Sequence, residues 1–117
     1  MSVTVRLGER DILLAPPASY AMRYDVVLAE TRNRQRALCA ALGACWQSTG
    51  APGGRYDYDV MRFGGAVFDD LIGRGLRARD VYAAGARAML LMQDGLFAEA
   101  EVAEAAGNSG AGADPAP

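Results

Sequence analysis

A run of ten residues without a charged side chain, from Ala37 to Trp46, constrains the fold of this chain more than any other feature. Its sequence, ALCAALGACW, places apolar or small residues all around a helix, whereas a surface helix carries an apolar stripe on one face only. A helix of this kind must be covered on every side by other parts of the chain. We therefore predict that this segment is the most buried helix of the fold.

The first 15 residues predict a short β-hairpin. Residues 3–7 alternate between apolar and polar side chains, residues 8–11 form a polar turn, and residues 12–14 return as a second strand. A lone hairpin is only marginally stable in water, so its apolar face is expected to rest on helices. The two prolines at 16–17 end it.

After the prolines, the apolar period changes from two residues to about 3.6, which predicts helices. Ser19 is a suitable N-cap for the first helix, and Asn33 is a suitable N-cap for another. Whether residues 18–47 form one bent helix or two is left open. The apolar stripe of the first part consists of Tyr20, Tyr24, Val27 and Leu28.

A glycine-rich and proline-rich loop over 47–55 precedes the next helix, for which Asp57 or Asp59 provides the cap. Gly73 and Gly75 are expected to end that helix, because glycine readily adopts the left-handed conformation of a C-cap. The apolar stripe of this helix consists of Val60, Phe63, Gly64, Val67 and Leu71. The residues expected to face water are Arg62, Asp69 and Asp70.

A further helix begins near Ala78, with Asp80 in its first turn, where a negative charge is favourable, and ends at Gly95. Residues 96–106 are mostly alanine and glutamate and predict a weak helix. Residues 107–117 carry no side chain able to anchor a fold, and we expect them to be disordered. The inner face of the strong helix consists of Val81, Ala84, Ala88 and Leu91.

These elements predict an α+β fold that is mainly α, in which the N-terminal hairpin (1–15) packs on a bundle of four to five helices. The length of the chain allows one domain, which we place over residues 1–106, followed by a disordered tail over 107–117.

Two adjacent glycines, Gly64 and Gly65, lie inside a predicted helix, where each costs roughly 1 kcal/mol relative to alanine. Close packing of another helix is the usual compensation, and the small residues over 83–88 offer a matching face. We therefore expect the two helices to cross near 64–65. The alternative is a backbone surface that is open to a ligand or a partner.

The chain contains no histidine, which is the usual general base and a common zinc ligand, so it predicts neither catalytic residues nor a metal site. The aspartate pairs at 57/59 and 69/70 lack a third ligand in register. Cys39 and Cys45 lie too far apart in one helix for a disulfide and are expected to be small buried side chains in a reducing compartment. We therefore expect a protein without enzymatic activity and without a cofactor.

The net charge of −2 favours neither nucleic acid nor a membrane surface as a partner. The arginines within 32–36 are interpreted as a solvated helix face, and the helix–turn–helix outline over 59–93 has a second helix too apolar to read DNA. No apolar run approaches the roughly 20 residues of a membrane span, and the N-terminus lacks a signal-peptide pattern. We therefore expect a cytoplasmic protein, with a small DNA-binding regulator as a less favoured alternative.

The best candidate for a binding surface is a group of aromatic residues that flank the loop over 47–55. Trp46, Tyr56 and Tyr58 belong to this group, and Met61 follows closely. Tryptophan and tyrosine dominate binding hot spots, and methionine adapts to varied partners. We take these four residues as candidate partner-binding residues, with anchoring of the loop to the core as the alternative.

The order of these parts resembles that of the tail assembly chaperones of long-tailed phages and gene transfer agents. The similar features are the N-terminal hairpin, a helix ending in RALCAALGACW, the segment YDYDVMRFGGAVFDDLIGRG, a further helix and a tail of small residues. The resemblance covers most of residues 1–107 and rests on this pattern. No functional residue of the family carries over, because these proteins recognise their client through a surface.

The resemblance implies a protein that binds the long, aggregation-prone tape-measure protein and helps tail-tube subunits assemble around it. Such a protein acts in the cytoplasm of the bacterial host and is absent from the finished particle. The chain would match the short form of a family that often has a frameshifted long form, and a homo-oligomer is compatible with this reading. The alternative is a structural head–tail connector or tail-completion protein that stays in the particle.

Overall fold

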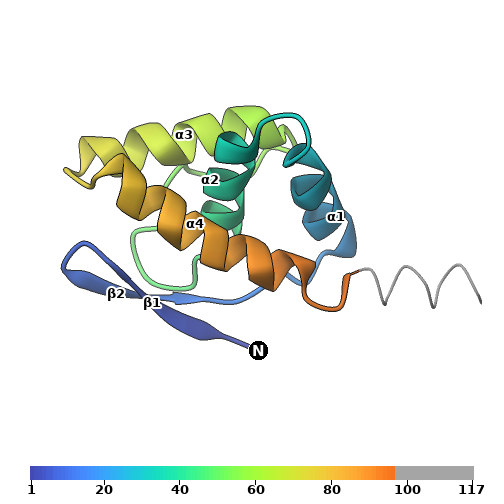
Figure 1. Ribbon diagram of the computed structural model, residues 1–117, viewed down its shortest axis with the longest axis horizontal. Helices are drawn as coiled ribbons and strands as arrows, with labels where there is room; N and C mark the ends of the chain where they lie inside the picture. The colour runs from blue at the N-terminus through green and yellow to red at the C-terminus, as the bar shows by residue number, and fades with distance from the viewer. Residues whose placement is uncertain (97–117) are drawn as a thin grey trace, which may run out of the picture.

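The computed structural model describes residues 1–96, in which a β-hairpin packs beside four helices (Figure 1). The predicted α+β, mainly α architecture is therefore confirmed. Of the weak helix predicted over 96–106, all but the first residue lies outside the described residues, and so does the tail predicted over 107–117. The elements are β1 (Val3–Leu7), β2 (Arg10–Leu14), α1 (Tyr20–Ala29), α2 (Arg34–Cys45), α3 (Val60–Gly73) and α4 (Ala78–Gln93).

The two strands pair antiparallel, with Val3 opposite Leu14 and Leu7 opposite Arg10. The predicted four-residue turn is thus too long, since only residues 8–9 lie between the strands. The polar residues that follow the turn continue the alternation on the solvent face, where the Arg6 guanidinium lies 3.1 Å from the Asp11 carboxylate. The buried face, which rests on the helices as expected, consists of Val5, Leu7, Ile12 and Leu14.

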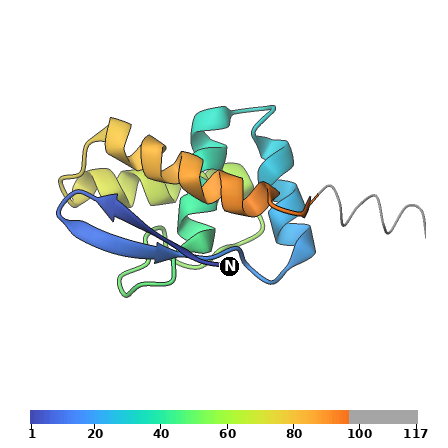
Figure 2. The ribbon, with the colours of Figure 1, turned by 60° about the horizontal axis from the view of Figure 1, so that its bottom comes forward.

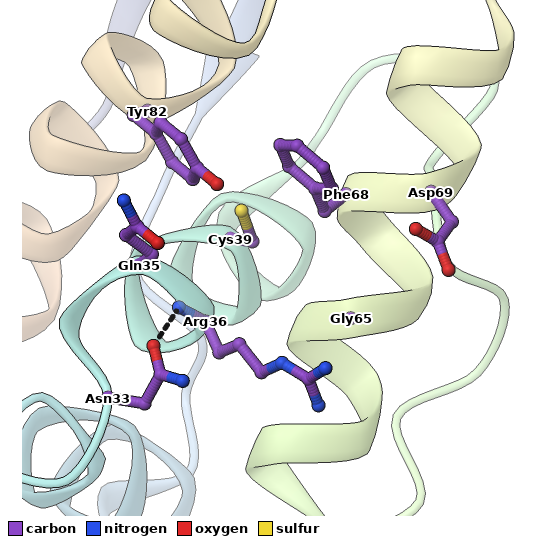
Figure 3. Close-up of a pocket in the computed structure, with 8 residues that line it drawn as sticks. All are labelled: Asn33, Gln35, Arg36, Cys39, Gly65, Phe68, Asp69 and Tyr82. Carbon is purple, nitrogen blue, oxygen red and sulfur yellow. Dashed lines mark hydrogen bonds between the residues drawn. The ribbon is translucent and has the colours of Figure 1, made fainter.

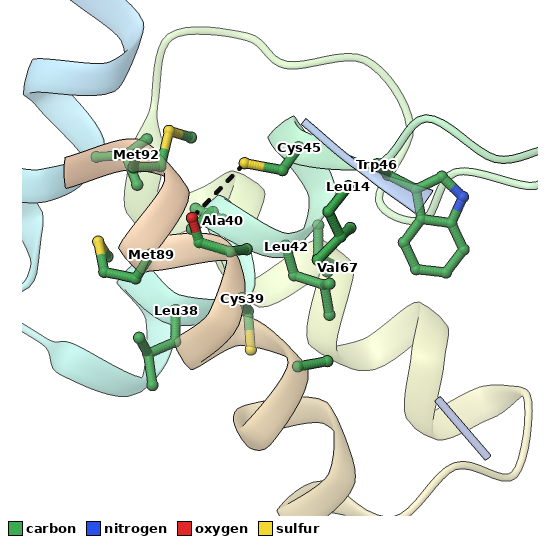
Figure 4. Packing of buried hydrophobic residues seen from close by; sticks show 14 of the residues in the cluster. Leu14, Leu38, Cys39, Ala40, Leu42, Cys45, Trp46, Val67, Met89 and Met92 are labelled. Atoms are coloured by element: carbon green, nitrogen blue, oxygen red, sulfur yellow. Dashed lines mark hydrogen bonds between the residues drawn. The ribbon is translucent and has the colours of Figure 1, made fainter. Parts of the chain in front are cut away.

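Helix α2 lies at the centre of the bundle, with α3 and α4 on either side (Figures 1 and 2). It makes most of its interhelical contacts with these two helices, whereas α3 and α4 touch each other only slightly. The prediction that this segment is the most buried helix is confirmed, and Figure 4 shows its side chains within the core. The buried residues of α2 are Ala37, Leu38, Cys39, Ala40, Ala41, Leu42 and Cys45.

The glycines of α3 and α4 pack against α2, and not against each other. A Cβ added at Gly64 would lie 2.1 Å from the carbonyl oxygen of Arg36, and one added at Gly85 would lie 2.7 Å from that of Leu38. The expected crossing of α3 with α4 near Gly64–Gly65 is therefore wrong. Close packing remains the reason for these glycines, because α2 fills both faces that a bare backbone leaves open.

The segment over 18–47 forms two helices, which answers the question that its sequence left open. Ser19 Oγ accepts a hydrogen bond of 3.1 Å from the Met22 amide at the start of α1. Asn33 Oδ1 accepts one of 3.1 Å from the Arg36 amide at the start of α2. Both side chains act as the N-caps that the sequence predicts.

The end of α3 differs in one detail from the sequence prediction. Gly73 is the last residue of α3 and Arg74 is its C-cap, so the left-handed residue is Gly75, with a φ of +92°. The predicted caps at the other ends are confirmed, since the Asp59 carboxylate accepts from the Arg62 amide at 3.1 Å and α4 stops just before Gly95. Within residues 1–96, no helix is long and apolar enough to cross a membrane.

Candidate functional site

The apolar stripe of α1 faces outward. Tyr20, Tyr24 and Leu28 are 41%, 38% and 46% exposed, and the rings of the two tyrosines stack with their centroids 6.0 Å apart. Of the predicted stripe, only Val27 is buried. The core face of α1 is formed by the adjacent small and β-branched side chains, namely Val26, Val27 and Ala29.

An arginine of α1 fixes this orientation. The Arg23 guanidinium donates hydrogen bonds to the carbonyl oxygens of Met92, at 3.4 Å, and Asp94, at 2.6 Å. Helix α1 is thereby attached to the C-terminal end of α4, as Figure 2 shows. The side chains of Tyr20, Tyr24 and Leu28 lie on the neighbouring face of α1 and therefore stay partly exposed to solvent.

Tyr58 is the most exposed large apolar side chain near α1, at 86%. Its φ of +68° makes it the only non-glycine residue within 1–96 with a left-handed backbone. For an L-amino acid with a Cβ, this conformation costs roughly 1–2 kcal/mol. The surrounding loop must therefore hold Tyr58 in place at the expense of folding stability.

Hydrogen bonds on either side of Tyr58 provide this restraint. The Asp57 carboxylate accepts from the Asp59 amide at 3.1 Å and forms an ion pair with Arg62, while Asp59 caps α3. The ring of Tyr58 meets that of Tyr56 edge to face, with centroids 5.3 Å apart. The loop before α3 is thus a short, internally bonded support for an exposed aromatic ring.

A groove of about 590 Å³ connects Tyr58 with α1. Leu28, at the end of the stripe of α1, lines this groove together with Tyr58, whereas Tyr20 and Tyr24 precede it along the same helix. We call Tyr20, Tyr24, Leu28 and Tyr58 the α1–Tyr58 surface. The groove is lined by Asp25, Leu28, Ala29, Thr31, Arg32, Tyr58, Asp59 and Val60.

The structure separates the four predicted partner-binding residues. Tyr56 and Tyr58 lie together, and Tyr56 also meets Phe63 edge to face with centroids 5.2 Å apart. Met61 is half-buried against the core. Trp46 is buried in another part of the fold, against the hairpin, where its indole nitrogen donates to the Thr49 carbonyl oxygen at 3.2 Å. Trp46 thus anchors the loop, and Tyr58 is the exposed member of the group.

Acidic side chains gather around the hydroxyl of Tyr56. This hydroxyl oxygen is buried and has no hydrogen-bond partner within residues 1–96. Burial raises the pKa of the Tyr56 phenol above its usual value, and the negative charges of Asp25, Asp57 and Asp59 raise it further. The carboxylates of Asp25 on α1 and of Asp57 and Asp59 before α3 thus lie close enough to act on the same phenol.

A second recess, of about 310 Å³, lies between α2, α3 and α4 (Figure 3). The Arg36 side chain lies across α3 at Gly65 and donates to the Met61 carbonyl oxygen at 3.4 Å. The rings of Phe68 and Tyr82 stack with centroids 5.4 Å apart. These contacts hold the helices together, and we interpret the recess as a packing feature. Its lining is Asn33, Gln35, Arg36, Cys39, Gly65, Phe68, Asp69 and Tyr82.

Both cysteines are buried and free, as the sequence predicts. Burial raises the pKa of the Cys39 thiol to about 11 and that of the Cys45 thiol to about 12. The Cys45 thiol donates a weak hydrogen bond of 3.7 Å to the Ala88 carbonyl oxygen (Figure 4). Since the thiolate is the nucleophile and the metal ligand, both groups are chemically inert at neutral pH. Within residues 1–96, no three Cys, Asp or Glu side chains are grouped to hold a metal ion.

Comparisons with protein-family models, with curated proteins and with solved structures find no match to this chain. The resemblance to tail assembly chaperones thus stays a prediction from the sequence. The feature from which a function can be argued is the α1–Tyr58 surface. Its geometry suits binding, because it offers exposed aromatic and aliphatic side chains beside a groove.

Proposed function

We propose that this protein is a non-enzymatic assembly chaperone that binds the tape-measure protein of a phage-like tail. It would act in the cytoplasm of the bacterial host and assist the assembly of tail-tube subunits around that client. The observation that supports this proposal best is the α1–Tyr58 surface, which leaves three aromatic rings and a leucine exposed along one helix and its neighbouring loop.

An assembly chaperone must cover apolar parts of its client until assembly buries them. It therefore needs an apolar surface of its own that is stable in water while unoccupied. Tyrosine meets this need, because its ring supplies contact area while its hydroxyl stays hydrated. Three of the four residues on the surface lie on a helix that Arg23 holds to α4, so this part of the surface is held in place before the client arrives.

The methionines contribute little to this surface. Met89 and Met92 are buried in the core, and Met61 is half-buried against it. They fill space between helices, as methionine commonly does. An adaptable methionine groove is thus not the basis of the proposal, which rests on the tyrosines and Leu28.

Co-purification from the native host tests the function. The tagged protein is isolated while particles are being produced, and mass spectrometry identifies its partners and searches finished particles for it. We expect a very long, helix-rich partner together with the protein, and no copies in finished particles. Recovery inside particles would instead identify a head–tail connector or tail-completion protein, and recovery without a partner would contradict both.

A matched pair of variants links this result to the surface. Tyr24→Ser removes an exposed ring from the α1–Tyr58 surface, and Leu90→Ser removes a 62% exposed leucine from α4 outside it. Both changes lower surface hydrophobicity and leave the core intact. We expect loss of the partner with Tyr24→Ser only.

A further inference from the structure

We infer that the α1–Tyr58 surface binds a single amphipathic helix of the partner, whose apolar stripe packs on Tyr20, Tyr24, Leu28 and Tyr58 and whose flank carries lysine or arginine opposite Asp25. This inference rests on the proposed function and deepens it, because it states the chemistry of the segment that is bound.

The spacing of the surface residues fits a helix. Tyr20, Tyr24 and Leu28 are four residues apart, so they form a line along α1 that spans about 12 Å. A partner helix of about three turns presents apolar side chains at the same spacing. The groove beside Leu28 extends this line toward Tyr58, so a helix lying along α1 would contact all four residues.

Tyr58 has the features of an anchor. Its backbone is held in a left-handed conformation that asparagine or glycine would tolerate better. Its ring meets only the edge of Tyr56 among the aromatic side chains of residues 1–96 and stays 86% exposed. Tyrosine is also among the residues that contribute most binding energy when a partner buries them. The loop thus holds an exposed ring at the rim of the groove.

The charges at the rim of the groove determine which charge is favoured on the partner helix. Asp25 is exposed and has no ion pair or hydrogen bond from its carboxylate within residues 1–96. Asp57 forms an ion pair with Arg62. The charged side chains that line the groove are Asp25, Asp59 and Arg32, two negative charges and one positive charge. The excess is negative, so a cationic residue on the partner helix is favoured.

The charges on α1 also argue against a second copy of this chain as the occupant. A second copy that packs its α1 antiparallel about Tyr24 would place Asp25 opposite residue 23. Arg23 is already engaged by the carbonyl oxygens of Met92 and Asp94, so it is poorly available to pair with Asp25.

Fluorescence anisotropy with the full-length protein and two labelled synthetic peptides tests the inference. The peptides have the same length and the same leucine stripe, and one carries lysines on its flanks where the other carries glutamates. We expect saturable binding of the lysine peptide and affinity at least about tenfold lower for the glutamate peptide. Asp25→Lys should reduce or reverse this preference. Absence of binding, or equal binding of both peptides, would overturn the inference.

Tyr58→Asn tests the anchor independently of folding. Asparagine tolerates the left-handed conformation, so the melting temperature is expected to stay the same or rise. The affinity for the lysine peptide should nevertheless fall about tenfold or more, while Leu90→Ser leaves it unchanged. Unchanged affinity of Tyr58→Asn, or a dimer in sedimentation that Tyr24→Ser dissociates, would contradict the inference.

The two proposals can fail separately. If a long partner co-purifies from the host equally well with wild-type, Tyr58→Asn and Asp25→Lys proteins, the function stands and the binding surface is wrong. If the lysine peptide binds as described but no such partner is recovered from the host, the surface stands and the function is wrong.

Discussion

Gly64 on α3 lies so close to Arg36 on α2 that a Cβ at Gly64 would come within 2.1 Å of the Arg36 carbonyl oxygen. Real Cβ atoms do not approach backbone so closely, and a carbonyl oxygen cannot turn away as a flexible side chain can. The contact therefore sets the distance and the crossing point of α2 and α3. It also explains why a glycine is retained inside a helix, where its own propensity is unfavourable.

Gly64→Ala is accordingly expected to destabilise the fold by about 1–3 kcal/mol, although alanine is the better helix former. Gly73→Ala is the control, because Gly73 also belongs to α3 and a Cβ there meets nothing within 4 Å. That change is expected to leave stability unchanged or raise it by up to about 1 kcal/mol. Urea unfolding followed by circular dichroism measures both, and equal stability of the two variants would contradict the packing described.

A charge at the centre of the core is expected to unfold the protein. Leu42 of α2 and Val67 of α3 are fully buried, so Leu42→Asp or Val67→Asp would leave a carboxylate without solvent or a partner. Leu90→Asp, on the exposed face of α4, is the control and should cost about 1 kcal/mol, because a carboxylate is unfavourable in the last turn of a helix. Thermal unfolding distinguishes them, and an unchanged melting temperature for Val67→Asp would refute the core assignment.

The Asp70 carboxylate connects the glycine-rich loop to α3 and gives stability a dependence on acid. It accepts from the Gly53 amide at 2.9 Å and pairs with the Arg74 guanidinium at 2.8 Å. The side-chain hydrogen bond from Arg74, the backbone one from Gly53 and the Arg74 charge lower the pKa of Asp70 below its ordinary value of 3.8, although partial burial opposes this.

Because the folded state holds the charged form, this stabilisation is present at neutral pH and is lost as the pH falls below 3.8 through the folded pKa. The pair is about one third exposed, so we expect Asp70→Asn to cost less than about 1 kcal/mol at neutral pH. The difference in melting temperature between wild type and Asp70→Asn should shrink toward zero in acid. A difference that grows in acid would show that Asp70 stabilises the fold by another route.

The buried thiols are expected to be unreactive in the native protein. With pKa values of about 11 for Cys39 and about 12 for Cys45, almost no thiolate is present at neutral pH, and neither sulfur is accessible. Alkylation monitored by mass spectrometry should modify neither residue until guanidinium chloride unfolds the chain. Rapid modification of the folded protein would mean that α2 is less protected than described.

Local signals in the sequence predicted much of the fold. Alternation identified the hairpin, and the caps Ser19, Asn33 and Asp59 were recognisable because each is a polar residue directly before a helical period. The uncharged run in α2 predicted its central position. These features depend on neighbouring residues along the chain, so the sequence contains them explicitly.

Features that depend on distant segments were not predictable. The glycines of α3 matched the small face of α4 by composition, but α2 lies between these helices and meets both. Similarly, the four-residue period in α1 shows that the helix has an apolar stripe, but it does not show whether that stripe faces the core or the solvent. The face of α1 that carries Val26 and Ala29 is also apolar, and it is this face that is buried. The contact of Arg23 with Met92 at the end of α4, 69 residues away, determines which face is buried.

The candidate site was predictable only in part. Tyr58 was identified because it is an aromatic residue beside a loop, and Trp46 was grouped with it for the same reason. Their separation follows from the bridge between Trp46 and Leu14, which places the indole against the hairpin. Pairing between segments this far apart leaves no periodic signal in the sequence.

Quantitative co-purification from the producing host shows whether the α1–Tyr58 surface binds the client. The tagged wild type is compared with a Tyr24→Ser/Tyr58→Asn variant and with Leu90→Ser, after circular dichroism has shown that all three are folded. We expect wild type and Leu90→Ser to recover the same long, helix-rich partner, and the double variant to lose it. Full recovery of that partner by the folded double variant would mean that the client binds elsewhere on the protein.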